Sequence, residues 1–192
     1  MLHFSYHSTR CFFLKSSKGN GYLAIDAGWP CTLYEYARNL KSLGFRLDDI
    51  RWAFVTHYHM DHAGLTGEFL DHGITCFIFE NQADAIDSME RTIQKNYGAY
   101  RTIDRTKLVS VKTQGSRSLL EGLGVDGEVI VTDYHSPDSV SFVSTEGESV
   151  VGDLPPEAQG MPDDRRLHDC WDLLRGLGAR RVFPSHGPWF EL

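Results

Sequence analysis

The sequence predicts an α/β fold of the α+β kind, in which strands alternate with helices and some strands pair as hairpins. Two observations predict it. Short apolar runs of strand length end repeatedly beside Gly or Pro, and three longer segments repeat apolar residues at helical spacing. With 192 residues, 41% of them hydrophobic, the chain is expected to form a single domain over residues 1–192.

Three helices are expected along the chain. Thr32 and Glu35 have the spacing of a capping box, and apolar residues then recur at helical spacing until Gly44, which ends the helix. A second amphipathic helix is expected over Asn81–Asn96. A third is expected over Leu167–Leu177, closed by the glycine that follows.

The expected strands share one property, which is that most of them end at a potential metal ligand or hydrogen-bonding carboxylate. The first two form a hairpin over His3–His7 and Cys11–Ser16. Five further runs lead to Asp26, to His57, to His135, to Asp153 and to His186, namely Tyr22–Ile25, Trp52–Val55, Glu128–Thr132, Ser149–Val151 and Arg181–Phe183. Reactive groups on loops at strand ends are typical of functional sites rather than of cores.

The most informative segment is the H-x-H-x-D-H pattern formed by His57, His59, Asp61 and His62. In an extended backbone, His57 and His59 lie on the same side, as two ligands of one ion must. Asp61 and His62 offer an oxygen and a nitrogen to a second ion. Imidazole and carboxylate ligands favour zinc, iron or manganese over metals that prefer thiolates.

Taken in order, these motifs resemble those of the metallo-β-lactamase-fold hydrolases, and among them the glyoxalase II and acyl-homoserine lactonase branch. The resemblance implies an αββα sandwich, two mixed β-sheets flanked by helices, with two metal ions at one edge. It implies that the ions are zinc, with iron or manganese as alternatives, and it assigns seven ligands: His57, His59 and His135 for the first ion, Asp61, His62 and His186 for the second, and Asp153 as a bridge. Asp26 would lie behind the ligands and orient them.

The expected activity is hydrolysis of an ester, thioester or lactone bond of a small molecule. A hydroxide shared by the two ions would attack the carbonyl carbon, and Asp61 would pass a proton to the leaving group. The family often has Gly at the position before the equivalent of His135. This sequence has Tyr134 there, so a phenol is expected at the rim of the metal site.

Three alternatives stay open. A persulfide dioxygenase of the same fold would use a single iron on His57, His135 and Asp153. A phosphodiesterase or nuclease is disfavoured by the formal charge of −7, because a nucleic-acid footprint is normally basic. A non-catalytic protein with a structural metal is disfavoured because structural zinc sites are closed and rich in Cys.

The expected partner is a small-molecule substrate, with neither nucleic acid nor a membrane. No apolar run approaches the ~20 residues of a membrane span, and Met1–Ser17 lacks the uninterrupted apolar core of a secretory signal. A cytoplasmic location is therefore expected, with the four cysteines as buried free thiols. Substrate contacts are expected from three segments: Trp29-Pro30, Pro155–Pro162 and Lys95–Arg105, the last being either an anion-binding segment or a solvated helix end.

Overall fold

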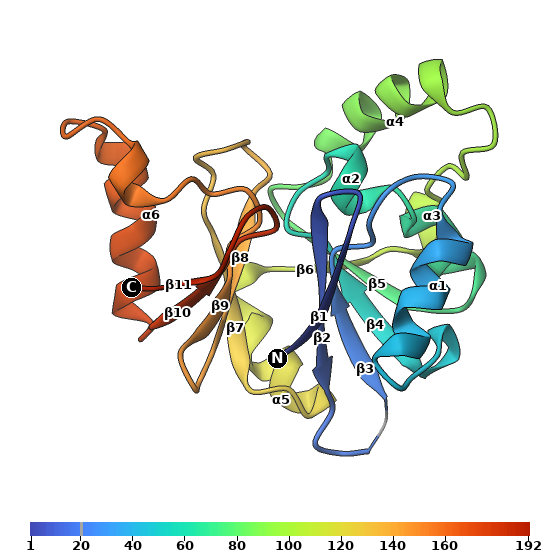
Figure 1. Ribbon diagram of the computed structural model, residues 1–192, viewed down its shortest axis with the longest axis horizontal. Helices are drawn as coiled ribbons and strands as arrows, with labels where there is room; N and C mark the ends of the chain where they lie inside the picture. The colour runs from blue at the N-terminus through green and yellow to red at the C-terminus, as the bar shows by residue number, and fades with distance from the viewer. Residues whose placement is uncertain (20) are drawn as a thin grey trace.

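Two β-sheets packed face to face, with helices on their outer faces, make up the protein (Figure 1). The structure is a computed structural model and describes residues 1–19 and 21–192. Both sheets mix parallel and antiparallel pairs. The predicted αββα sandwich is therefore confirmed.

The first sheet has six strands in sequence order, and its first two form the predicted hairpin. β1, β2 and β3 pair antiparallel, whereas β3 to β6 are parallel. The strands are β1 (Leu2–Tyr6), β2 (Thr9–Lys15), β3 (Tyr22–Ile25), β4 (Ile50–Phe54), β5 (Thr75–Phe79) and β6 (Val109–Val111). Because β3 and β4 are parallel, the loops that follow them leave the sheet at the same edge.

The second sheet has five strands in the order β11-β10-β9-β8-β7. Only β9 and β10 are parallel neighbours, but β7 runs in their direction too, because it is two antiparallel steps from β9. These strands are β7 (Gly127–Val131), β8 (Val140–Ser144), β9 (Glu148–Val150), β10 (Arg181–Phe183) and β11 (Phe190–Glu191). The loops after β7, β9 and β10 consequently meet at one edge.

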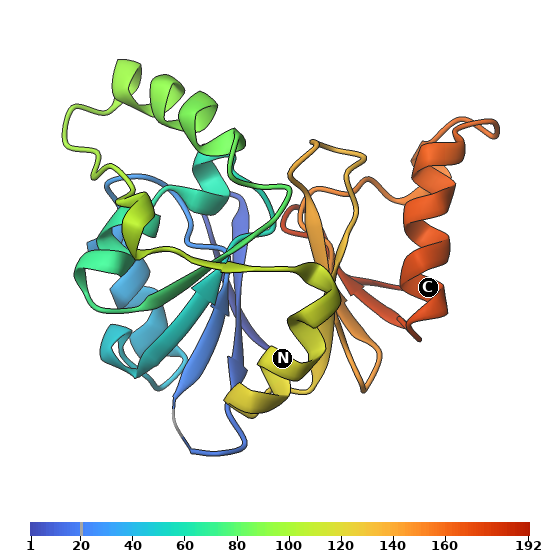
Figure 2. The same cartoon turned by 180° about the vertical axis from the view of Figure 1, so that it is seen from behind.

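Helices cover both outer faces. In Figure 1, α1 and α3 lie outside the first sheet and α6 lies outside the second, while Figure 2 shows α5 at the boundary between the sheets. The helices are α1 (Leu33–Ser42), α2 (Met60–Ala63), α3 (Thr66–Asp71), α4 (Ala85–Asn96), α5 (Ser116–Leu123) and α6 (Arg165–Gly176). None of them, within the residues described, has the length and apolar character needed to cross a membrane.

Three apolar clusters hold these layers together. The central one lies between the sheets and joins Phe12 and Phe54 of the first to Phe142 of the second, all at most 2% exposed. The other two pack helices against the outer faces, with Tyr36 of α1 and Trp171 of α6 fully buried. Burial of large aromatic side chains supplies much of the hydrophobic stabilisation of such layers.

The helix predictions were right in position but wrong in detail at two N-termini. Thr32 does not cap α1, because its hydroxyl donates to the carbonyl of Trp29 instead. Glu35, the expected partner in the capping box, contacts His7. The second helix begins at Ala85 and not at Asn81, because Gln82 is buried and its side-chain amide bonds to the backbone of neighbouring strands and loops.

The cysteines depart from expectation in one position. All four are free thiols, as predicted, and Cys11, Cys76 and Cys170 are buried. Cys31 is exposed, because it lies in the turn before α1 with a left-handed backbone (φ +62°).

Candidate metal centre

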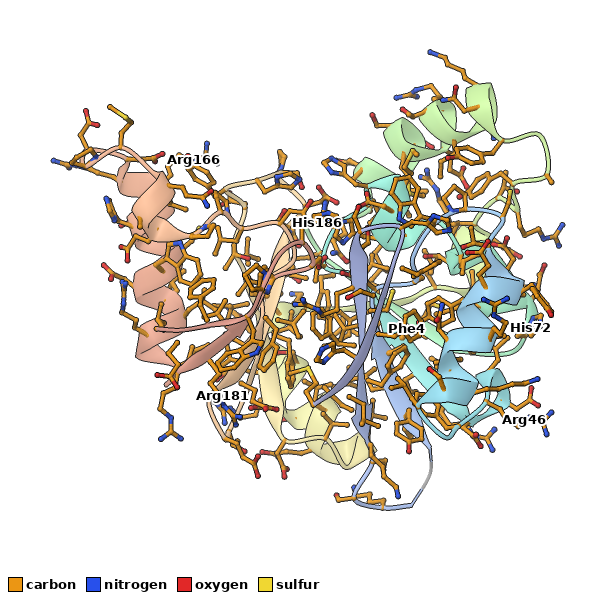
Figure 3. The ribbon with its side chains drawn as sticks, in the orientation of Figure 1. Phe4, Arg46, His72, Arg166, Arg181 and His186 are labelled. Atoms are coloured by element: carbon orange, nitrogen blue, oxygen red, sulfur yellow. The ribbon has the colours of Figure 1, made fainter. Side chains whose placement is uncertain are left out.

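The seven predicted ligands lie together at the edge where strands of both sheets end. His57, His59, Asp61 and His62 come from the loop and short helix after β4. His135, Asp153 and His186 follow β7, β9 and β10 of the other sheet. Figure 3 places His186 at the boundary between the two halves of the molecule. The centre is thus assembled from both sheets, and neither sheet alone contains it.

The first cluster consists of three imidazoles and one carboxylate oxygen. Nδ1 of His59 lies 3.1 Å from Nε2 of His57 and 3.2 Å from Nε2 of His135. Oδ2 of Asp153 lies 3.8 and 3.7 Å from those same two Nε2 atoms. Two ligands about 2.1 Å from one tetrahedral zinc ion would be about 3.4 Å apart, so the spacing of these atoms suits a single ion.

The second cluster gathers around the other oxygen of the same carboxylate. Oδ1 of Asp153 lies 3.4 Å from Nε2 of His62 and 3.3 Å from Nε2 of His186. Oδ2 of Asp61 lies 3.3 and 3.2 Å from those two nitrogens. Asp153 therefore presents one oxygen to each cluster, which is the placement a bridging ligand requires.

Two buried polar atoms show that these residues fit metal ions. Nε2 of His62 and Oδ1 of Asp153 are both inaccessible to solvent and have no hydrogen-bond partner among the residues described. Buried polar atoms almost always have a partner, because leaving one unsatisfied is costly. Both atoms face the second cluster, where a cation would satisfy them.

Asp26 lies behind the ligands, where it was predicted to be. Its Oδ1 accepts hydrogen bonds from the backbone N–H and the hydroxyl of Thr56, and its Oδ2 accepts from Nδ1 of His62 and from Ser185. With Nδ1 engaged in this way, His62 must direct Nε2 toward the second cluster. Asp26 adopts a left-handed backbone (φ +69°), a strained conformation of the kind found at functional sites.

Gly152 allows the two halves to approach at this point. Its φ is +57°, and a Cβ atom there would lie 2.8 Å from Oγ1 of Thr56. Any larger residue would push the Asp153 loop away from the His57 loop. The Gly-Asp pair thus has a steric reason to precede the shared carboxylate.

A hydrogen-bond chain that ends on Asp61 was missed by reasoning from the sequence. The buried hydroxyl of Thr9 donates to Oδ2 of Asp61 at 2.9 Å, and the indole N–H of Trp29 donates to Oγ1 of Thr9 at 3.2 Å. An indole can only donate, so the single proton of Thr9 is left for Asp61. Trp29 was predicted to contact substrate, but its indole nitrogen is directed to Thr9 instead.

The turn between β1 and β2 orients His186. His7 and Ser8 both have positive φ values, +48° and +67°, and the Ser8 carbonyl accepts a hydrogen bond from Nδ1 of His186 at 2.8 Å. That bond leaves Nε2 free for the second cluster. Arg10 holds the same loop by donating to the carbonyls of Pro184 and Gly187.

The electrostatics of the centre favour neutral ligands in one cluster and a cation in the other. Burial, reinforced by the neighbouring imidazoles, lowers the pKa of His57 well below its ordinary value, so this ring is neutral. Burial opposes ionisation of Asp61, but the charge of the adjacent His62 and the hydrogen bond from Thr9 outweigh it and lower the Asp61 pKa. Burial also acts to lower the pKa of His62, yet Asp26, Asp153 and Asp61 together raise it well above the ordinary value. The same negative surroundings would stabilise a bound metal ion.

Two cavities open beside the ligands. One, of about 750 Å³, extends from His59 and Asp61 to α4, and the other, of about 460 Å³, adjoins His135, Asp153 and His186. Pro155 and Pro156 line the smaller cavity, so part of the predicted Pro155–Pro162 segment does border the centre.

One expectation about the rim was wrong, and for a second segment the ion pairs favour one of the two interpretations left open. The phenol of Tyr134 lines neither cavity, because it donates to Asp164 at the start of α6 and packs in the outer cluster. In the Lys95–Arg105 segment, Arg101 pairs with Asp71 and Arg105 with Asp87. These arginines are engaged with exposed carboxylates, which is the behaviour of a solvated helix end.

Comparison with known proteins identifies relatives of this chain. A family model described as the metallo-beta-lactamase superfamily matches residues 7–186. "Probable metallo-hydrolase YqjP" of Bacillus subtilis is 32% identical over 88% of this chain, and "Beta-lactamase-like protein 2 homolog" of Caenorhabditis elegans is 25% identical over 86%. This chain spans 65% and 52% of the lengths of those two proteins.

Solved structures show the same fold at low sequence identity. The protein TTHA1623, solved in a di-iron-bound form, superposes with a TM-score of 0.71 at 19% identity, covering 99% of this chain and 93% of its own. TTHA1429 of Thermus thermophilus, a metallo-beta-lactamase family protein, gives 0.68 at 20% identity, covering 98% and 72%.

Proposed function

Because this chain belongs to the metallo-beta-lactamase superfamily, we propose that its two ligand clusters bind two divalent metal ions and hydrolyse an ester, thioester or lactone bond of a small molecule. The proposal extends to the glyoxalase II and acyl-homoserine lactonase branch, whose ordered motifs the sequence resembles. Zinc is the proposed metal. Iron is the alternative, since the relative TTHA1623 was solved in a di-iron-bound form.

The observation that carries this proposal is the division of the Asp153 carboxylate between the clusters. Its Oδ2 faces His57 and His135, while its Oδ1 faces His62 and His186. Such an arrangement would serve two ions held close together. A single iron on His57, His135 and Asp153 would leave the second cluster without a role, which argues against the dioxygenase.

When bound, two such ions polarise a carbonyl group and make water a nucleophile near neutral pH. The residues of this chain would supply position and proton transfer. Asp26 and Ser8 hold His62 and His186 in a single orientation, through hydrogen bonds to the Nδ1 atom of each ring. Asp61 is ionised and borders the larger cavity, so it can accept the proton released by the attacking water and then pass that proton to the leaving group.

The proposal is tested by metal content and turnover measured together. Elemental analysis of metal-supplemented protein should give two ions per chain, and wild type should cleave members of a panel of thioesters, aryl esters and lactones without consuming oxygen. His62→Ala should reduce that rate by several orders of magnitude, because His62 belongs to the second cluster only. His72→Ala is the matched control, since His72 is exposed and outside both clusters.

Two results would contradict the proposal. A stoichiometry of one ion after full supplementation would remove the dinuclear centre. Oxygen uptake with a persulfide substrate that survives His62→Ala would identify the iron dioxygenase instead.

A further inference from the structure

We propose that the larger cavity selects substrates by charge, accepting an uncharged or positively charged group beyond the scissile bond and disfavouring a negatively charged one. The inference rests on the hydrolase function proposed above and adds a substrate class to it. It also identifies Asp84, at the start of α4, as a specificity-determining residue.

The cavity lies where it can accommodate the part of the substrate beyond the scissile bond. His59 and Asp61 of the two clusters border one side of it, so a substrate held at the metal centre would extend into it. The opposite side is one face of α4, which contributes an apolar and hydroxyl-bearing surface: Ala85, Ser88, Met89 and Thr92. At about 750 Å³, the cavity is within the size range of small-molecule sites.

The charges that line this cavity are of one sign. Apart from the metal-cluster residues His59 and Asp61, its charged lining residues are the carboxylates Asp84 and Asp138, and neither a Lys nor an Arg of the described part of the chain is among them. Asp138 is buried and accepts a hydrogen bond from the backbone N–H of Tyr58 at 2.6 Å, which fixes it in place. Asp84 is exposed, and its carboxylate does not cap the backbone of α4, so it can interact with a bound group.

Arg91 and Lys95 of α4 are exposed and are not among the residues that line the cavity. The cations that follow the helix in sequence pair with carboxylates elsewhere. Arg105 pairs with Asp87 of α4 itself, and Arg101 pairs with Asp71 on α3. Lys107 lies within 4.0 Å of both Asp71 and Asp104. An anionic group in the cavity would therefore meet two carboxylates, and no arginine or lysine of the described residues lines the cavity to balance them.

The metal ions themselves would attract an anion, so the selectivity concerns the part of the substrate that lies beyond them, along α4. The effect of one exposed charge at contact distance is modest because water screens it. Two unit charges 4 Å apart in bulk water change a binding constant by about fivefold. We expect discrimination of that order from Asp84, and more from the two carboxylates together.

The test uses three thioesters that share the S-ethyl thioacetate core and carry a cationic, an uncharged or an anionic distal group. Acetylthiocholine is cationic, S-(3,3-dimethylbutyl) thioacetate is its uncharged isostere, and 2-(acetylthio)ethanesulfonate is anionic. With metal-loaded wild type, kcat/KM should fall in that order, by about fivefold or more between the first and the last. Asp84→Asn should reduce the preference and Asp84→Lys should reverse it. Asp163→Lys, the same charge change on the exposed segment before α6, should leave the order unchanged.

A binding measurement keeps the inference testable if none of the thioesters is cleaved. The chain has four methionines, of which Met60 and Met89 line the cavity, whereas Met1 and Met161 do not. Methyl-labelled methionine spectra can therefore report occupancy as choline, 3,3-dimethyl-1-butanol or isethionate is added. Choline and the neutral alcohol should shift the Met60 and Met89 signals at lower concentration than isethionate does.

The outcomes separate the two proposals. Absence of turnover of these thioesters together with charge-ordered shifts at Met60 and Met89 would count against thioester hydrolysis and support the charge selection. Turnover or binding in which the anion equals or exceeds the cation, or an order unaffected by Asp84→Lys, would overturn the charge selection and leave the hydrolase intact.

Discussion

At the scale of single residues, the centre depends most on Asp153, because each of its two oxygens faces a different cluster. Asp26 acts on the same centre from behind, through Thr56, His62 and Ser185. Removing each of the two carboxylates should therefore have a different effect on metal binding. One would take part in holding the metals, and the other would orient residues that hold them.

Asp153→Ala should lose affinity for both ions and nearly all turnover. Asp153→Asn keeps the shape of the side chain and should fail in the same way, because the amide lacks the negative charge. Asp26→Ala should retain metal and lose activity on the order of 10–100-fold. Competition with a chromogenic chelator measures the metal affinity. Full activity of Asp153→Ala on a confirmed substrate would show that Asp153 is not the bridging ligand.

Thr9 offers a sharper test of orientation. Thr9→Val removes the hydroxyl that donates to Asp61 and leaves the Trp29 indole without its acceptor. The affinity of the second cluster should fall on the order of 10–100-fold, while the first cluster, which Thr9 does not touch, keeps its affinity. Thr9→Ser restores the hydroxyl and should recover most of the loss. Equal metal affinities in the valine and serine variants would show that the hydrogen bond has no role.

At the scale of elements, the features that could be predicted were those that give a local pattern in the sequence. The apolar runs predicted β3, β4, β7, β9 and β10. The Asp and His residues that follow these strands are the residues of the candidate centre. The contact between Thr9 and Asp61 spans 52 positions, and that between Ser8 and His186 spans 178, so no local spacing reveals either. The capping box failed for a related reason, because Thr32 bonds to the Trp29 carbonyl and to Tyr6.

Helix α6 carries a pH-sensitive contact away from the centre. Its His168 bonds to Glu157, which raises the His168 pKa, while Arg175 and His168 hold the Glu157 pKa at about 2. Only the histidine thus titrates near neutrality. Since its folded pKa is raised, its stabilising effect is complete below the ordinary histidine value of about 6.5 and is lost as pH rises through the folded pKa.

The expected outcome is a pH-dependent difference between wild type and His168→Gln. In urea unfolding, wild type should be the more stable at about pH 5.5, and the difference should shrink at about pH 8. A chemical-shift titration of the His168 ring gives the direction of its pKa shift independently. A difference that grows with pH would contradict the assignment.

At the scale of the whole molecule, the centre joins the two sheets. Asp26 and the His57–His62 segment come from the first, and His135, Asp153 and His186 come from the second. Ions bound there would link the halves of the sandwich at one edge. The chain is also expected to unfold as one unit, as a single domain over residues 1–192 would.

Removal of metal should therefore lower the thermal stability of the protein. Ions that bind the folded chain stabilise it by about 4 kcal/mol at a thousandfold excess over the dissociation constant. Dialysis against a chelator should lower the Tm, and zinc should restore it in a concentration-dependent manner. Asp153→Ala should start at a lower Tm than metal-loaded wild type and respond weakly to zinc. Two separate melting transitions in metal-loaded wild type would contradict the single domain.

The β1–β2 turn also constrains the order in which the chain can fold. Ser8 and Arg10 contact residues 184–187, more than 170 positions away, and closing so long a loop is a slow step. A chain emerging from the ribosome exposes the hairpin early but cannot bond it to His186 until that residue has been made. We therefore expect the second cluster to form late in folding, because the orientation of His186 depends on a contact with the β1–β2 turn, 178 positions away.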